Sequence, residues 1–194
     1  MQPWYIATES FTRGHDAWAK YIAWSGLTQL EEVVSLDPML CPSLLPDIKA
    51  EYWPHIVNED FMLNFFVDLQ FLLDQIPDAT ERNLLCVFRN PSTEPPLRAA
   101  ASLNFEILGY DLVDVQASAS ALTNCGGFPE IFENSELSSK GLITSYTRAW
   151  EVQSELRQRY PDEPHANCHV WAILRAVARS HALQSSAAVD DAPR

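Results

Sequence analysis

A long apolar segment near the middle of the chain constrains the fold more than any other feature. Over residues 56–76, apolar side chains cover most of a helical circumference and leave a narrow polar stripe of Asp60, Asn64 and Asp68. A helix that is apolar on most sides must be surrounded by protein. The most apolar part, residues 61–73, is too short to cross a membrane. The segment therefore predicts a central, largely buried helix.

Four other segments have the spacing or the terminal signals of helices. One of them places Trp18, Tyr21 and Trp24 at helical intervals, which predicts that these rings belong to the core. Another opens with a capping box, in which Thr28 and Glu31 satisfy each other's backbone donors. These predicted helices are residues 16–24, 28–36, 144–160 and a last helix that opens at Asp162 with Pro164 in its first turn.

Short apolar or alternating segments bounded by turn residues predict strands at residues 84–88, 105–115 and 119–125. The expected fold class is α+β, a mainly helical single domain packed around a small three-stranded antiparallel sheet. We expect the globular domain to comprise residues 1–184. Residues 185–194 lack large apolar side chains and are expected to form a flexible tail.

The chain is strongly acidic, with a formal net charge of −13. Residues 31–81 contain eleven carboxylates and a single cation, Lys49. A negative field of this kind repels nucleic acid and anionic lipid and attracts basic proteins, although solubility alone also accounts for it. We therefore expect a basic protein partner, no nucleic acid and no membrane, and leave the oligomeric state open. The expected contact residues are Glu31, Glu32, Glu59, Asp60 and Asp68.

Four cysteines lie far apart in the sequence and form no CxxC pair. The first residues also lack the basic and apolar regions of a secretory signal. Both observations favour reduced thiols and a cytoplasmic protein.

One group of side chains has the residue types of a zinc site. Cys125, His165, Cys168 and His169 would supply two sulfur and two nitrogen ligands, a set that zinc accepts. His165, Cys168 and His169 stand where the last helix is expected to begin, so that residues three and four apart would share a face. Their spacing is not that of a zinc finger or zinc ribbon, and the main expectation is no cofactor.

Cys125 also precedes a glycine pair, a context that a cysteine nucleophile could use. His165 or His169 would then act as its base, and Asp111 or Asp114 would orient the imidazole. A simpler interpretation is a structural turn at residues 124–128, with Cys168 packed as a small apolar group. The main expectation is accordingly no catalytic residue.

Three segments resemble parts of a family of functionally uncharacterised bacterial proteins: Leu108–Asp114, Ser120–Phe128 and His165–Ile173. The resemblance extends to Val34–Cys41. It implies a bacterial origin and a self-contained domain, and it transfers no activity and no site residue.

These observations together predict an acidic cytoplasmic module that binds another protein. An immunity or antitoxin-like bacterial inhibitor of a basic effector fits the charge best. The alternative is a small enzyme or a zinc-supported domain that uses Cys125 with His165, Cys168 or His169.

Overall fold

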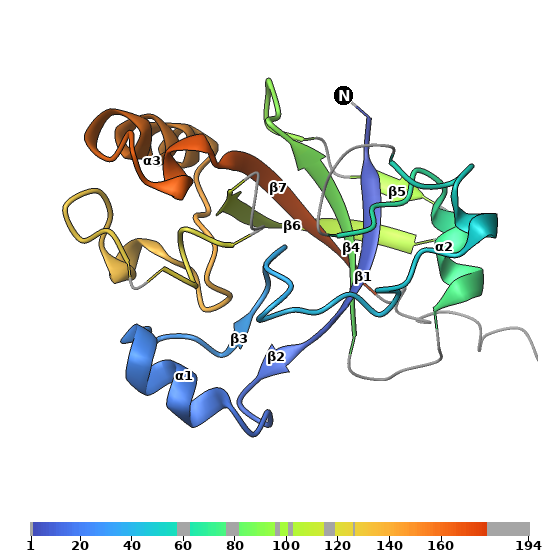
Figure 1. The fold of residues 1–194 in the computed structure, drawn as a ribbon, viewed down its shortest axis with the longest axis horizontal. Helices are drawn as coiled ribbons and strands as arrows, with labels where there is room; N and C mark the ends of the chain where they lie inside the picture. The colour runs from blue at the N-terminus through green and yellow to red at the C-terminus, as the bar shows by residue number, and fades with distance from the viewer. Residues whose placement is uncertain are drawn as a thin grey trace, which may run out of the picture.

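The fold is organised around a five-stranded antiparallel sheet with the strand order β1-β4-β7-β6-β5 (Figure 1). The computed structural model describes residues 2–57, 63–76, 82–95, 98–100, 103–114, 119–125 and 127–177. The strands of this sheet are β1 (Trp4–Glu9), β4 (Arg82–Arg89), β5 (Arg98–Ala100), β6 (Leu103–Val113) and β7 (His169–Val177). Because β4 lies between β1 and β7, the sheet joins the two ends of the described chain.

A second, two-stranded sheet pairs β2 (Phe11–Thr12) with β3 (Glu32–Val33). Helix α1 (Trp18–Ser25) lies between these strands in the sequence and beside them at one end of the molecule (Figure 1). The prediction of this helix is confirmed. Gly26 ends it in the left-handed conformation, with φ of 70°, and its N–H donates to the Ile22 carbonyl.

The predicted central helix is largely wrong. In the described part of residues 56–76, the helix is only α2 (Leu69–Gln75), which Asp68 caps by accepting a hydrogen bond from a backbone N–H. Phe66 is instead extended, and it exchanges two backbone hydrogen bonds of 2.8 Å with Tyr5 at the edge of β1. The apolar side chains of this segment are buried because the chain lies against the main sheet. They do not belong to a helix that is surrounded by protein.

The helix predicted at residues 28–36 is also wrong. This part of the chain forms β3 and an extended continuation of it. Val33 packs in one hydrophobic cluster, whereas Val34 and Leu36 pack in another. Side chains that alternate between two apolar surroundings are typical of extended chain, and here they mimic the spacing of a helix face.

Near the C-terminus, one helix is confirmed and one is wrong. Helix α3 (Tyr146–Arg159) begins after Ser145, whose hydroxyl accepts from the Arg148 N–H. The predicted last helix is only a short 3-10 helix, η3 (Pro164–Asn167), followed by the strand β7. Because β7 is paired on both sides and covered on both faces, its residues are almost uniformly apolar, and a period of two is not visible in the sequence.

Two of the three predicted strands are confirmed as β4 and β6. The third is wrong, because residues 119–125 form a turn whose backbone pairing with β6 is limited to an isolated bridge between Val113 and Ser120. The pairing of β6 with β7 is interrupted by a register shift between Ile107 and Gly109. The mainly helical fold class is therefore corrected: strand makes up 28% and helix 25% of the described residues, and the main sheet has five strands.

Both faces of the main sheet are buried. Within β7, Val170, Ala172 and Leu174 belong to the larger hydrophobic cluster, whereas Trp171 and Ile173 belong to the smaller one. Side chains on opposite faces of this sheet therefore cannot meet. The predicted C-terminal tail lies outside the described residues.

Candidate functional site

A buried network of hydrogen bonds joins three segments that are far apart in the sequence. We call it the Asp111 network; its members are Ser35, Asp37, Asp111, Ser120 and Asn124. The Asp111 carboxylate, which is fully buried, accepts from the Ser35 hydroxyl at 2.6 Å and the Ser120 hydroxyl at 2.7 Å. Asp37 accepts from the Ser120 N–H at 3.0 Å and the Asn124 side chain at 2.7 Å.

The Asp111 carboxylate is fully buried and is therefore not accessible to a substrate. Two further donors, the N–H groups of Leu36 and Leu112, also reach the Asp111 carboxylate. Burial nevertheless raises the pKa of Asp111 to about 6, because the hydrogen bonds from Ser35, Ser120 and Leu36 only partly offset the loss of hydration and the nearby Asp37 charge adds to the shift. With four protein donors around it, Asp111 acts as a structural acceptor that ties the turn at Ser120 to β6 and to the chain after β3.

Cys125 does not have the environment of an activated nucleophile. Its Sγ lies 2.7 Å from the Ala121 carbonyl, to which the thiol donates. Burial raises the pKa of Cys125 to about 11, and the nearby Asp111 carboxylate adds to this shift. A reactive cysteine needs a lowered pKa, so this geometry gives no support to the role predicted for Cys125 with His165 and Asp111.

His165 lies in η3 and packs edge-on against Phe128, with ring centroids 5.7 Å apart. Its Nδ1 is buried without a hydrogen-bond partner in the described structure. Burial lowers the pKa of His165 despite the opposing charges of Asp114, Glu163 and Asp37, so the imidazole is neutral at neutral pH. The ring is thus a packed side chain beside the turn that carries Cys125.

Cys168 and His169 project to opposite sides of the sheet, because they are neighbours where β7 begins. Cys168 is part of the larger hydrophobic cluster, and burial raises its pKa to about 12. His169 lies on the other side, edge-on to Trp171, with Nδ1 2.8 Å from the Asn90 side chain. The four residues predicted as zinc ligands are therefore not brought together, and no group of three or more metal-binding side chains occurs among the described residues.

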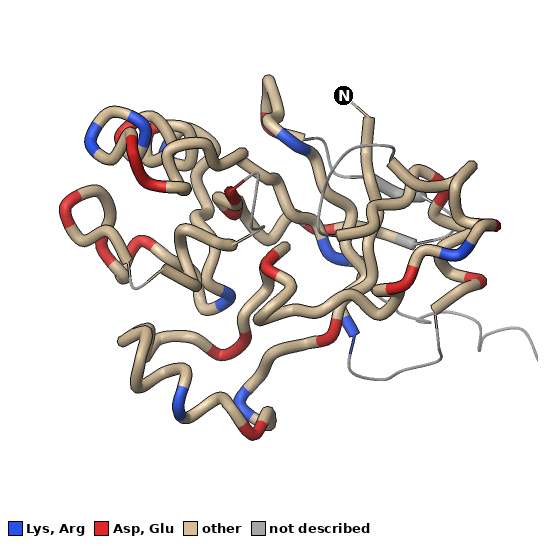
Figure 2. Tube along the Cα trace, in the orientation of Figure 1, with Lys and Arg blue, Asp and Glu red and all other residues tan. Residues whose placement is uncertain are grey.

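The carboxylates predicted to contact a partner are placed differently from one another. Glu31 is exposed, whereas Glu32 is mostly covered and pairs with Arg175 at 2.8 Å and with Lys140 at 3.5 Å. Asp68 caps α2 and lies 3.3 Å from His55. The remaining two, Glu59 and Asp60, lie outside the described residues. Acidic positions are spread along the whole trace rather than gathered on one element (Figure 2).

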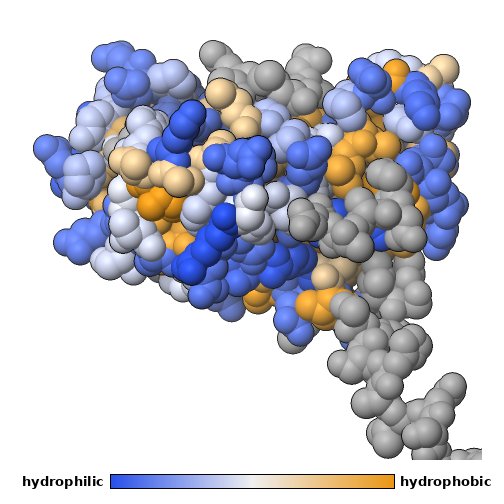
Figure 3. All heavy atoms as spheres, turned by 90° about the horizontal axis from the view of Figure 1, so that it is seen from below, coloured by the Kyte–Doolittle hydropathy of each residue, from blue (hydrophilic) through white to orange (hydrophobic). Residues whose placement is uncertain are grey.

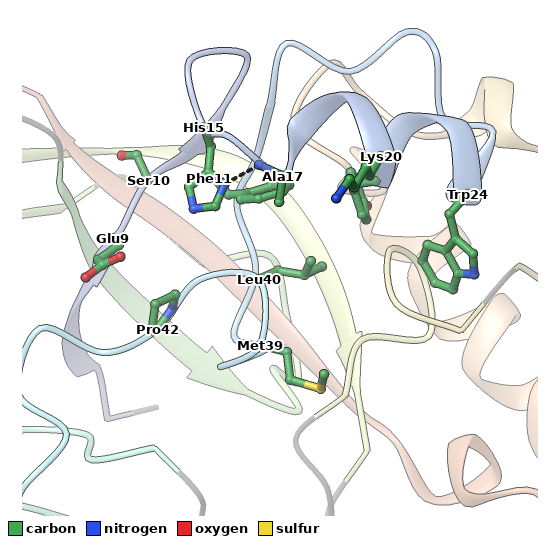
Figure 4. Close-up of a pocket in the computed structure, with 11 residues that line it drawn as sticks. Glu9, Ser10, Phe11, His15, Ala17, Lys20, Trp24, Met39, Leu40 and Pro42 are labelled. Atoms are coloured by element: carbon green, nitrogen blue, oxygen red, sulfur yellow. Dashed lines mark hydrogen bonds between the residues drawn. The ribbon is translucent and has the colours of Figure 1, made fainter.

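A groove beside α1 is the feature that the sequence did not reveal. We call it the α1 groove; it has a volume of about 350 Å³. One wall comes from β1, β2 and α1, and the other from the segment after β3 (Figure 4). Its lining residues are Glu9, Ser10, Phe11, His15, Ala17, Lys20, Tyr21, Trp24, Met39, Leu40 and Pro42.

The two ends of the α1 groove differ in chemistry. Glu9 and His15 lie toward one end, whereas Trp24 lies at the other end, on the α1 wall, and Met39 lies on the wall formed by the segment after β3 (Figure 4). His15 is held in place because its ring packs 4.8 Å from that of Phe11 and its Nδ1 accepts from a backbone N–H of the same loop. Trp24 is 56% exposed and Met39 is 82% exposed.

Trp24 corrects the prediction that all three aromatic rings of this helix belong to the core. Trp18 and Tyr21 are buried, as predicted. Trp24 lies six positions after Trp18, about 120° around the helix from it, because successive helical residues are about 100° apart. This angle was the available signal that Trp24 lies beyond the buried face. No signal in the sequence placed Met39 opposite it.

The surface seen from below the view of Figure 1 is largely hydrophilic, with separate apolar patches (Figure 3). No helix in the described part of the chain is both long enough and apolar enough to cross a membrane. Comparison with protein-family models, with curated proteins and with solved structures finds no match.

Proposed function

We propose that this protein is a cytoplasmic binding module, and that a basic protein partner inserts an apolar side chain into the α1 groove. The observation that carries the proposal is the pair of exposed apolar side chains, Trp24 and Met39, which lie on opposite walls of the groove. A bacterial immunity or antitoxin-like role is the form of this function that the acidic charge favours.

The exposed side chains of the α1 groove are suited to a protein contact. An exposed tryptophan keeps a large apolar surface in water, and covering it is favourable by roughly 25 cal/mol for each Å² removed from water. Tryptophan is also enriched among the residues that dominate binding energy, and methionine adapts its shape to a partner. The floor beneath them is rigid, since Phe11 and Tyr21 are buried and their rings pack edge-on at 5.2 Å.

The preference for a basic partner comes from the whole chain. Within the groove, Glu9 and Lys20 carry opposite charges and leave the lining without a strong field of its own. The net charge of −13 steers cationic proteins toward the molecule and repels a second copy of the same chain. This argument favours a basic protein over a homodimer as the occupant of the groove.

Site-specific photo-crosslinking tests the proposal. A benzoylphenylalanine in place of Met39 should crosslink a basic protein in an extract of the native cells, and Trp24→Ala in the same chain should lower the yield by roughly tenfold. The crosslinker in place of Ile48, which is 45% exposed outside the lining of the groove, is the matched control. The yield should also fall with rising salt, because the attraction is screened.

Equal crosslinking from Met39 and Ile48, or none from Met39 at low salt, would overturn the proposal. A crosslinked product with the mass of two copies of this chain would assign the groove to self-association instead.

A further inference from the structure

A second concave site lies between α3 and the segment that follows β4. We call it the α3 cleft; it is shallow, with a volume of about 600 Å³. Along α3, its lining residues follow one stripe of the helix, because positions 146 and 147, 150 and 151, and 154 recur at intervals of three or four residues. They are Tyr146, Thr147, Trp150, Glu151 and Ser154, and the opposite wall is Asn90, Pro91 and Ser92.

Hydrogen bonds hold the two walls of the α3 cleft in fixed positions. The Tyr146 hydroxyl donates to the Pro91 carbonyl at 3.0 Å and so ties the helix to the opposite segment. Asn90 is anchored on β7, since its side chain accepts from the Val170 N–H at 3.0 Å and contacts His169 at 2.8 Å. A site whose walls are already fixed loses little conformational entropy when a ligand binds.

The chemistry of the lining selects the kind of ligand. Tyr146 and Trp150 supply aromatic surface, and three hydroxyl groups and the Glu151 carboxylate surround it. No lysine or arginine occurs among the described residues that line the cleft, so phosphates and carboxylates have no counter-charge there. Glu151 is 56% exposed, and one of its oxygens forms a long ion pair of 3.5 Å with Arg148 Nη1. Arg148 also binds Glu136 at the shorter distance of 2.6 Å through Nε. The exposed Glu151 carboxylate can therefore still accept hydrogen bonds from a ligand.

We infer that the α3 cleft binds a neutral saccharide. A sugar ring has an apolar face of C–H groups, which packs on an aromatic ring, and a rim of hydroxyls, which donate to a carboxylate and exchange hydrogen bonds with serine and threonine. Trp150 would carry the packing contact and Glu151 the strongest hydrogen bond. This site is separate from the α1 groove and does not depend on the function proposed for it.

Saturation-transfer NMR with the full chain tests this inference. The probes are glucose, galactose, mannose and N-acetylglucosamine, each as the monosaccharide and as a linear trimer. At least one should receive saturation on its ring protons. Ser154→Trp fills the cleft from an exposed position on α3 and should abolish the transfer, while Glu151→Ala should weaken binding by roughly tenfold.

Trp53→Ala is the matched control, because Trp53 is an exposed tryptophan outside the cleft and its loss should leave the transfer unchanged. Transfer to none of the eight probes would overturn the inference, as would transfer that survives Ser154→Trp. Stronger binding of glucose 6-phosphate than of glucose would overturn the neutral class of ligand, because it would require a cation in the cleft.

Discussion

At the scale of single residues, the Asp111 carboxylate has the most demanding surroundings in the structure. Replacing it with asparagine keeps the shape but turns one acceptor into a donor, which then faces the Ser35 hydroxyl and the Leu36 N–H. We expect Asp111→Asn to lower the free energy of unfolding by about 2 kcal/mol, the cost of a buried unpaired donor. Urea denaturation measures the change. Asp162→Asn, at an exposed position, should have no effect, and equal midpoints for the two variants would contradict the role given to Asp111.

Cys125 provides a residue-scale test of the alternative enzymatic role. Because burial raises its pKa to about 11, Cys125 should react with iodoacetamide at neutral pH far more slowly than a free cysteine, whose pKa is about 8.5. The rate should rise about tenfold for each pH unit up to the stability limit of the fold. Mass spectrometry of the labelled peptides resolves Cys125 from Cys41, Cys86 and Cys168, all three of which are buried. A titration midpoint below 8 would revive a cysteine nucleophile.

At the scale of secondary-structure elements, amphipathic segments were easier to predict than fully buried ones. Helices α1 and α3 each have one buried and one exposed face, and their periodicity is clear in the sequence. Strand β7 and the chain before α2 are covered on several sides, so their residues are apolar at nearly every position. Such segments fit a helix and a buried strand equally well, and only their partners in the sheet decide between the two.

The predicted zinc or catalytic site failed for the same reason, because the relative positions of its side chains depend on whether residues 165–169 form a helix or a strand. On a helix, His165 would have shared a face with both Cys168 and His169. At the start of β7, Cys168 and His169 instead point to opposite sides of the sheet. The approach of the Cys125 turn to the Asp111 network joins residues more than eighty positions apart, such as Asn124 and Asp37. Pairings at this distance in the sequence have no local signal.

Gly109 allows an element-scale test of the irregularity in β6. Its φ of +145° is unfavourable for other residues, and a Cβ there would lie 2.7 Å from the Ile143 carbonyl oxygen. Gly109→Ala should lower the free energy of unfolding by roughly 2–3 kcal/mol. Gly14→Ala is the matched control, since the nearest atom to its added Cβ would be 3.8 Å away. Similar thermal midpoints for both variants would show that β6 relaxes around the new side chain.

At the scale of the whole molecule, the acidic charge of the chain could be predicted fully from the sequence, but its contact surface could not. Glu32 shows the reason: its two cationic partners, Lys140 and Arg175, lie more than a hundred residues away in the sequence. Which carboxylates stay available to a partner depends on such tertiary pairings. The exposure of Met39 across from Trp24 likewise follows from where the chain after β3 lies against α1.

The pH dependence of stability combines opposing contributions from several of these carboxyl groups. Burial raises the pKa of Asp111 to about 6, above the value of about 3.9 for an unfolded chain. Between these two values the folded protein binds more protons than the unfolded chain, so this group lowers the free energy of unfolding as the pH rises from about 4 to about 6. The hydrogen bonds that lower the pKa of Asp68 and Glu136 act oppositely, and their stabilisation is lost as the pH falls below about 4.

The contribution of Asp111 to stability should therefore be largest near pH 4 and decline toward about pH 6, whereas the buried His165, whose pKa is lowered, contributes a rise as the pH increases toward 6.5. Asp111→Asn removes only the first contribution, so denaturant titrations of both proteins from pH 4 to 7 isolate it. The difference in unfolding free energy between the native chain and the variant should shrink by about 1.4 kcal/mol for each unit by which the folded pKa exceeds the unfolded one. A difference that stays constant over this range would mean that Asp111 titrates at the same pH in the folded and unfolded states, and that its four hydrogen bonds fully offset its burial.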